Sequence, residues 1–135
     1  MRILYVAMAD DYGDPFRGPS FEEANFRSAL EGMGHEIVPF DFMALKRALG
    51  KREMNRRLIA LAGEAKPDLA FFVLFEAEID PATIEQVSAI GGGPTVNWFT
   101  DDHWRFDHFS RHFEPSFDWA VTTDRDSLPK YRSIG

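Results

Sequence analysis

Short apolar runs alternate with amphipathic stretches along the chain. Five runs have the length of strands: residues 3–8, 36–40, 69–75, 95–99 and 119–122. Between them, apolar residues recur at intervals of three and four, the spacing of one helical face. The run from Leu69 to Phe75 is nearly unbroken, which is typical of a central strand covered on both faces. This alternation predicts βαβ units, parallel strands and right-handed crossovers.

Capping and turn residues locate the helices between these strands. Ser20 and Glu23 have the spacing of a capping box, and Asp80-Pro81 has the pattern of a helix start. We expect helices over residues 20–33, 53–65, 81–90 and after 124, with a shorter helix broken near Gly50. The expected fold is therefore α/β: a three-layer Rossmann-like domain over residues 1–135, with a parallel sheet of about five strands flanked by helices on both faces.

Composition narrows the classes of function. The chain has 135 residues, 44% of them hydrophobic, which suits one core. A net charge of -7 repels nucleic-acid phosphates, so we expect no nucleic acid as a partner. Because there is no cysteine, disulfides and thiolate ligands are excluded, and a cytoplasmic location is expected. No window approaches the length of a membrane-spanning helix, about 18 apolar residues.

The segment from Asn97 to Asp107 follows the fourth expected strand directly. It reads N-W-F-T-D-D-H-W-R-F-D, so two carboxylates, an imidazole and an arginine come straight after apolar residues. Open parallel sheets bind ligands at the carboxyl ends of their strands, so we expect a functional site here. The alternative for Asp101 and Asp102 is a structural role, since an Asp between a strand and a helix often caps the helix.

Six segments carry a likeness to a known family: M-R-I-L-Y-V, F-R-G-P-S, G-H-E-I-V-P-F, K-P-D-L-A-F-F, N-W-F-T-D-D-H-W-R-F-D and F-D-W-A-V-T-T-D. Together they make the chain resemble the amino-terminal domain of CgeB-like glycosyltransferases, the spore-maturation type with a GT-B fold. The W-F-x-D-D-x-W-x-F-D run is the most specific of them. The resemblance implies an acceptor-side half, with the donor-binding half absent.

Sugar transfer from a nucleotide-sugar donor to a sugar acceptor of unknown type is the activity that this resemblance implies. Such a reaction needs a group that takes the proton of the acceptor hydroxyl, and we assign this catalytic role to Asp101, Asp102 and His103. The nucleotide-sugar donor would bind only with a second domain, so we expect the chain to be inactive alone. No cofactor is expected.

Further substrate contacts are expected around this segment and in the loop after the first strand. In that loop, Arg17, Gly18 and the free N–H groups at the Ser20 helix start have the chemistry to hold an anion or a sugar hydroxyl. The alternative is an ordinary exposed connection. The predicted substrate-binding residues are Asp10, Arg17, Gly18, Ser20, Thr100, Trp104 and Arg105.

Aromatic residues and histidines crowd the helix that follows. Phe106, Phe109 and Phe113 have the spacing of a helical stripe, so we expect them in the core and Trp104 on the opposite side, free for a ligand. His108 and His112 lie four residues apart, a spacing that permits chelation of a divalent ion. A third ligand would have to come from another side of the helix, and we therefore expect no metal.

A basic segment stands out in an otherwise acidic chain. Such a segment is commonly a solvated helix face, and the alternative is contact with an anionic membrane surface or with a second domain. The basic residues are Lys46, Arg47, Lys51, Arg52, Arg56 and Arg57.

A second class of function is a stand-alone binding or signalling module of flavodoxin-like or receiver-like topology. Asp10 and Asp11 follow the first strand, as the acidic pair of a receiver does, and Thr100 follows the fourth. The third strand ends without a phosphorylatable aspartate, Glu76 being the nearest acid, and no lysine follows the fifth strand. Phosphate uptake from a small phosphodonor would favour a receiver, whereas sugar binding would favour a transferase.

Overall fold

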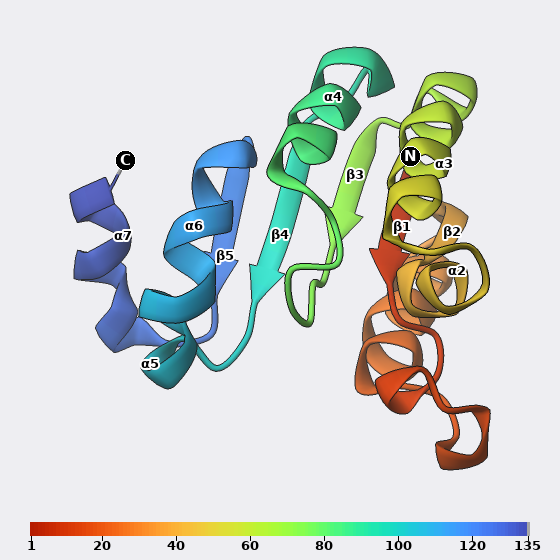
Figure 1. Cartoon of the computed structure of the whole chain (residues 1–135). Coiled ribbons are helices and arrows are strands. Elements are labelled where there is room, and N and C mark those ends of the chain that lie inside the picture. Colours follow the sequence, from red (N-terminus) through yellow and green to blue (C-terminus); the bar gives the residue numbers. More distant parts are fainter. Residues whose placement is uncertain (135) are drawn as a thin grey trace.

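A parallel sheet of five strands organises the chain (Figure 1). The structure is a computed structural model that describes residues 1–134. The strands lie in the order β2-β1-β3-β4-β5, and each pairs in parallel with its neighbours. Their bounds are β1 Arg2–Ala7, β2 Glu36–Asp41, β3 Leu69–Phe72, β4 Thr95–Phe99 and β5 Trp119–Thr122.

Helices cover both faces of this sheet. One face carries α2, α3, α4 and the segment from α5 to α6, whose apolar side chains share a core with Leu4 and Phe72. The helix before β2 covers the other face, where Phe26 and Leu30 pack around Tyr5. The helical elements are a π-helical turn Glu23–Arg27, α1 Ser28–Gly32, α2 Phe42–Leu49, α3 Lys51–Ala65, α4 Pro81–Gly91, α5 Asp102–Arg105, a π-helical turn Phe106–Ser110, α6 Arg111–Phe113 and α7 Leu128–Ile134.

This architecture confirms the expected α/β fold with helices on both faces of a parallel sheet. The strands and helices follow the predicted order, including the break between α2 and α3 at Gly50, whose φ is +80°. The stripe of Phe106, Phe109 and Phe113 is buried, as expected. No helix within residues 1–134 combines the length and the apolar character needed to traverse a bilayer.

The third strand is shorter than predicted. Pairing with β4 ends at Phe72, although the apolar run continues to Phe75. Beyond that point the Val73 amide still bonds the Val6 carbonyl at 2.9 Å, and the Leu74 amide bonds the side-chain oxygen of Asn97 at 3.3 Å. Residues 73 and 74 are therefore still buried after the pairing of β3 with β4 has ended, because the Asn97 side chain replaces a backbone acceptor of β4.

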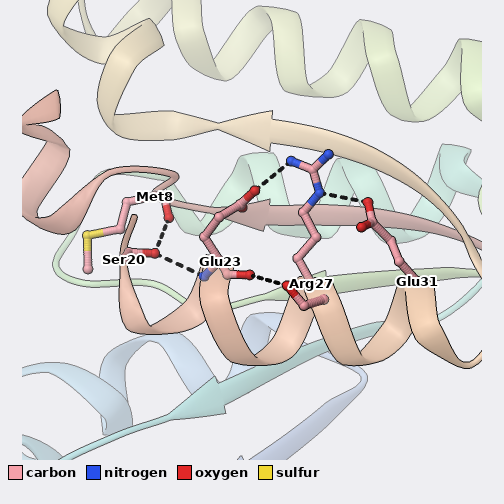
Figure 2. Close-up of polar contacts among 6 residues, drawn as sticks. Met8, Ser20, Glu23, Arg27 and Glu31 are labelled. Atoms are coloured by element: carbon pink, nitrogen blue, oxygen red, sulfur yellow. Dashed lines mark hydrogen bonds and ion pairs between the residues drawn. The ribbon is translucent and has the colours of Figure 1, made fainter. Parts of the chain in front are cut away.

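Ser20 begins the first helix, but the predicted capping box forms only in half (Figure 2). The Ser20 hydroxyl accepts from the Glu23 amide at 3.0 Å and donates to the Met8 carbonyl at 2.7 Å. The Glu23 carboxylate does not return to the Ser20 amide. It pairs instead with Arg27 at 2.7 Å, and Arg27 also bonds Glu31 at 2.9 Å. Ser20 thus ties the helix start to the end of β1.

Candidate functional site

A cleft of about 490 Å³ opens at the carboxyl edge of the sheet. The strand order reverses between β1 and β3: β2 lies on one side of β1, and the later strands lie on the other. Open α/β sheets bind ligands at such a switch point. The loops after β1, β3 and β4 all contribute walls, together with the helix that follows β4. The lining residues are Tyr12, Phe75, Glu76, Ala77, Asp101, Trp104, Arg105, His108, Phe109 and Phe113.

Arg105 forms part of the wall and is 7% exposed. Its guanidinium donates a hydrogen bond to the carbonyl of Phe75, which joins the helix after β4 to the loop after β3. The guanidinium carbon lies 4.6 Å from the ring centre of Phe109 and 5.7 Å from that of Trp104. Such cation–π contacts offset part of the cost of burying the charge.

Two cleft residues have a left-handed backbone. Tyr12 has a φ of +51° and Asp101 a φ of +61°. Asp tolerates this region, whereas a bulky residue such as Tyr is a genuine outlier there. Among residues 1–134 the third non-glycine case is Lys66, which ends α3. Strained backbone of this kind concentrates at functional sites, and here it coincides with the cleft.

Asp102 points away from the cleft into a closed polar cluster. It is fully buried, and its carboxylate accepts hydrogen bonds from Ser110 at 2.5 Å, Thr122 at 2.5 Å and Tyr131 at 2.7 Å. Burial, together with the bond to Asp102, raises the pKa of the Tyr131 hydroxyl. We name these four residues the Asp102 cluster. The cluster fastens the helix after β4 to β5 and α7, which favours a structural role for Asp102.

The three residues predicted to be catalytic are therefore divided by the structure. Asp101 lines the cleft, Asp102 lies in its buried cluster, and His103 is exposed outside the cleft lining. Thr100 is half-buried and does not line the cleft either. Trp104 and Arg105 do line it. A catalytic role for the three residues stays a prediction, while only Asp101 is placed where a ligand could meet it.

The predicted contacts in the loop after β1 serve the loop itself. The Arg17 guanidinium pairs with Asp11 at 2.7 Å and lies 4.7 Å from the Tyr12 ring centre. The bond to Asp11 raises the pKa of Arg17. Asp10 bridges to Pro19, and Gly18 makes the turn with a φ of +84°. The buried Ser20 amide donates to the Ala9 carbonyl at 2.8 Å, so this N–H group is not free for a ligand.

Several lining residues were not among the predicted contacts. Phe75, Glu76 and Ala77 follow β3, and the carboxyl-edge rule that selected the segment after β4 applies equally to them. Phe109 and Phe113 were predicted to lie in the core. Both are buried there, and both also line the cleft. Nothing in the sequence marks Tyr12 as a cleft residue, because its position depends on its unusual backbone angle.

Acidic partners already engage half of the basic segment. Arg56 and Arg57 bond Glu53 at 2.6 Å and 3.1 Å, and Lys51 pairs with Asp80 at 2.6 Å. The two guanidinium groups lower the pKa of Glu53 to about 2. Contact with an anionic membrane through this segment stays a prediction. Three of its six cations already have an acidic partner in the structure.

The fold of the chain is similar to that of a solved receiver domain. The signal receiver domain of a modulated diguanylate cyclase from Desulfovibrio desulfuricans G20 aligns with a TM-score of 0.55 at 14% identity, over 98% of this chain and 90% of that one. The response regulator domain of Thermotoga maritima CheB covers 99% of this chain and 92% of its own, at 10% identity and a TM-score of 0.48, a value too low to support an argument. No family model and no curated protein sequence matches the chain.

These comparisons correct the predicted family. The resemblance to CgeB-like glycosyltransferases of the spore-maturation type is wrong, because the solved structure whose fold this chain shares is a receiver domain and not a glycosyltransferase domain. The predicted function, the acceptor side of a sugar-transfer reaction, is overturned by the same finding. The fold agrees with the topology named in the alternative, since the strand order β2-β1-β3-β4-β5 is that of flavodoxin-like and receiver-like folds.

Proposed function

We propose that this chain is a receiver-like binding or signalling module that works without phosphoryl transfer, through the cleft at the carboxyl edge. The observation that carries the proposal is the end of β3. Where a receiver needs a phosphorylatable aspartate, this chain has Val73, Leu74 and Phe75, and the first two are buried in the core. An apolar side chain cannot accept a phosphoryl group.

The surroundings of that position also lack the parts that phosphoryl transfer needs. Asp11, one of the acidic pair after β1, is paired with Arg17. Within residues 1–134, no three carboxylate or imidazole groups gather into a set able to hold a metal ion. After β5 the chain has Thr123 and Asp124 where a receiver has its lysine, and the Thr122 hydroxyl is engaged by the Asp102 cluster.

What this edge does offer is a pocket. A cleft of about 490 Å³ falls within the usual range for small-molecule sites, roughly 300–1,000 Å³. Its aromatic walls, with a few convergent polar groups, match the usual chemistry of such sites. Binding here, at the junction of the loops after β1, β3 and β4, would couple a ligand to three parts of the fold.

Intact-protein mass spectrometry tests the first part of this proposal. The protein is incubated with acetyl phosphate and Mg²⁺, beside an authentic receiver domain as positive control. We expect the control to gain the mass of one phosphoryl group and this chain to gain none. Stable phosphorylation of Asp10, Asp11 or Glu76, located by peptide mapping, would overturn the proposal.

A further inference from the structure

The charge of Arg105 is buried in the cleft wall without an acidic partner. Among residues 1–134, no carboxylate forms an ion pair with it, and the carbonyl of Phe75 is its one hydrogen-bond partner. A guanidinium has five N–H donors. The guanidinium nitrogens that make no hydrogen bond keep some contact with solvent, and Arg105 lines the cleft.

An unpaired buried charge is costly unless something compensates it. The guanidinium fork matches the two oxygens of a carboxylate or a phosphate, which it binds with paired hydrogen bonds. Because Arg105 lines the cleft and has donors to spare, an anionic group that enters the cleft would supply the missing partner.

The walls of the cleft are suited to a flat ring. Trp104 and Tyr12 line it although they are 61% and 51% exposed, so both present aromatic surface to solvent. The ring of Tyr12 meets that of Phe75 edge-on, with centres 5.2 Å apart. Stacked or edge-on aromatic rings attract one another beyond what their burial alone provides. A planar ligand would cover these surfaces.

We propose that the cleft binds a planar aromatic ligand that carries a phosphate or a carboxylate. The anionic group bonds Arg105, and the ring packs against Trp104, Tyr12 and Phe75. This inference rests on the proposed function, since it names the ligand class of the same cleft.

Two carboxylates in the lining refine this class. Asp101 and Glu76 are exposed and line the same cleft as Arg105. They repel a ligand that is anionic over its whole surface, and they accept hydrogen bonds from ring N–H or amino groups. The preferred ligand therefore has one anionic end and a ring with N–H donors.

Isothermal titration calorimetry with four probes tests this proposal. Adenosine 5′-monophosphate and indole-3-acetate combine a ring bearing N–H donors with a phosphate or a carboxylate, whereas adenosine has only the ring and inorganic phosphate only the anion. We expect saturable binding of at least one combined probe, about tenfold or more tighter than adenosine or phosphate. Adenosine lacks the charged hydrogen bonds to Arg105, and phosphate lacks the ring that packs on the aromatic walls. The combined probe that binds tells a nucleotide-like from a carboxylic-acid ligand.

Substitutions locate the interaction. Arg105→Met should weaken binding of the combined probe by about tenfold or more, because it keeps the apolar stem but removes the donors. Arg111→Met is the matched control, since Arg111 lies on the same helical segment, outside the cleft lining, and should leave binding unchanged. Trp104→Ala, at an exposed position that tolerates truncation, should weaken binding several-fold.

Each outcome decides one claim. Absence of saturable binding by both combined probes, or equal binding by Arg105→Met, would overturn the ligand class. Adenosine binding as tightly as its monophosphate would overturn the role of Arg105. None of these results bears on the other part of the proposed function, the absence of phosphoryl transfer, which fails if the phosphodonor modifies the protein.

Discussion

Two buried charged side chains that follow β4, Asp102 and Arg105, differ in how many hydrogen-bond partners the protein provides. Asp102 turns inward, where three hydroxyl groups satisfy its carboxylate. Arg105 turns toward the cleft, with a single carbonyl partner in residues 1–134. Both are nearly inaccessible, at 0% and 7% exposure, so burial does not separate them. What separates them is whether the protein itself completes their hydrogen bonds.

This difference shows how a structural polar group can be told from a candidate ligand contact. A buried polar group whose hydrogen bonds are all made rigidifies the fold, and its removal leaves its partners without a hydrogen bond. A buried charge that is left incomplete costs stability until another molecule completes it. The two regions should therefore respond in opposite ways to substitution: the Asp102 cluster through stability, and Arg105 through binding.

The largest expected effect is on the Asp102 cluster. Asp102→Ala should lower the free energy of unfolding by about 3 kcal/mol or more, because the hydroxyls of Ser110, Thr122 and Tyr131 lose their acceptor in a buried place. Urea denaturation measures this change. Asp102→Asn retains a carbonyl acceptor and should cost clearly less. Small and equal losses of stability in the two variants would contradict a structural role for Asp102.

Glu78 sharpens the comparison, because it is a buried carboxyl with a sparser set of donors. It is 1% exposed and accepts a hydrogen bond from the Glu76 amide at 2.8 Å. Burial raises its pKa, partly offset by backbone hydrogen bonds and by Lys46. The folded state thus favours the protonated form, so stability falls as pH rises above the ordinary carboxyl pKa toward the raised one.

Glu78→Gln should consequently stabilise the protein at neutral pH by about 1 kcal/mol, because a buried charge is removed. At pH 4 the gain should nearly vanish, since the carboxyl is then largely protonated in both the folded and the unfolded chain. Thermal unfolding at both pH values measures the difference. A loss of stability at pH 7 would show that the Glu78 carboxylate is compensated after all.

Tyr131→Phe makes a smaller change in the Asp102 cluster. It removes one of three donors and keeps the ring that packs on Phe106 at 4.9 Å between centres. The expected loss is about 1 kcal/mol, the value of one hydrogen bond, because Thr122 still bonds the same carboxylate oxygen. Denaturation of the single variant and of Tyr131→Phe combined with Asp102→Asn should show non-additive losses.

The smallest effect on stability is expected at the cleft. Arg105→Met should change the free energy of unfolding by less than about 1 kcal/mol, or raise it, because replacing a buried charge by an apolar chain is often neutral or stabilising. Urea denaturation beside Asp102→Ala compares the two regions directly. A loss as large as that of Asp102→Ala would mean that Arg105 is a structural residue.

The sequence carried most of the fold and part of the site. Apolar runs and turn residues located all five strands, and the unbroken run of Leu69 to Phe75 indicated the central position of β3. The carboxyl-edge rule found the right edge of the sheet. Which of two adjacent aspartates faces the cleft could not be predicted, since it depends on the left-handed φ of Asp101.

The family resemblance failed for a reason that the structure makes visible: the matching segments serve the α/β fold. In K-P-D-L, Lys66 ends α3 with a left-handed backbone and the Asp68 carboxylate accepts from the Arg2 amide at 2.7 Å. In the segment after β4, Asn97 bonds the Leu74 amide and Asp102 bonds its cluster. Residues with such structural roles do not identify a reaction, because a fold does not imply a function.

The central proposal is that the cleft beside Arg105 binds a planar aromatic ligand with an anionic end. The most direct measurement is an NMR titration of amide chemical shifts with adenosine 5′-monophosphate and with indole-3-acetate. We expect saturable shifts at Tyr12, Phe75, Asp101 and Trp104, and unchanged amides in the basic segment. Shifts confined to β5 or the basic segment, or no saturable shift with either compound, would contradict the account.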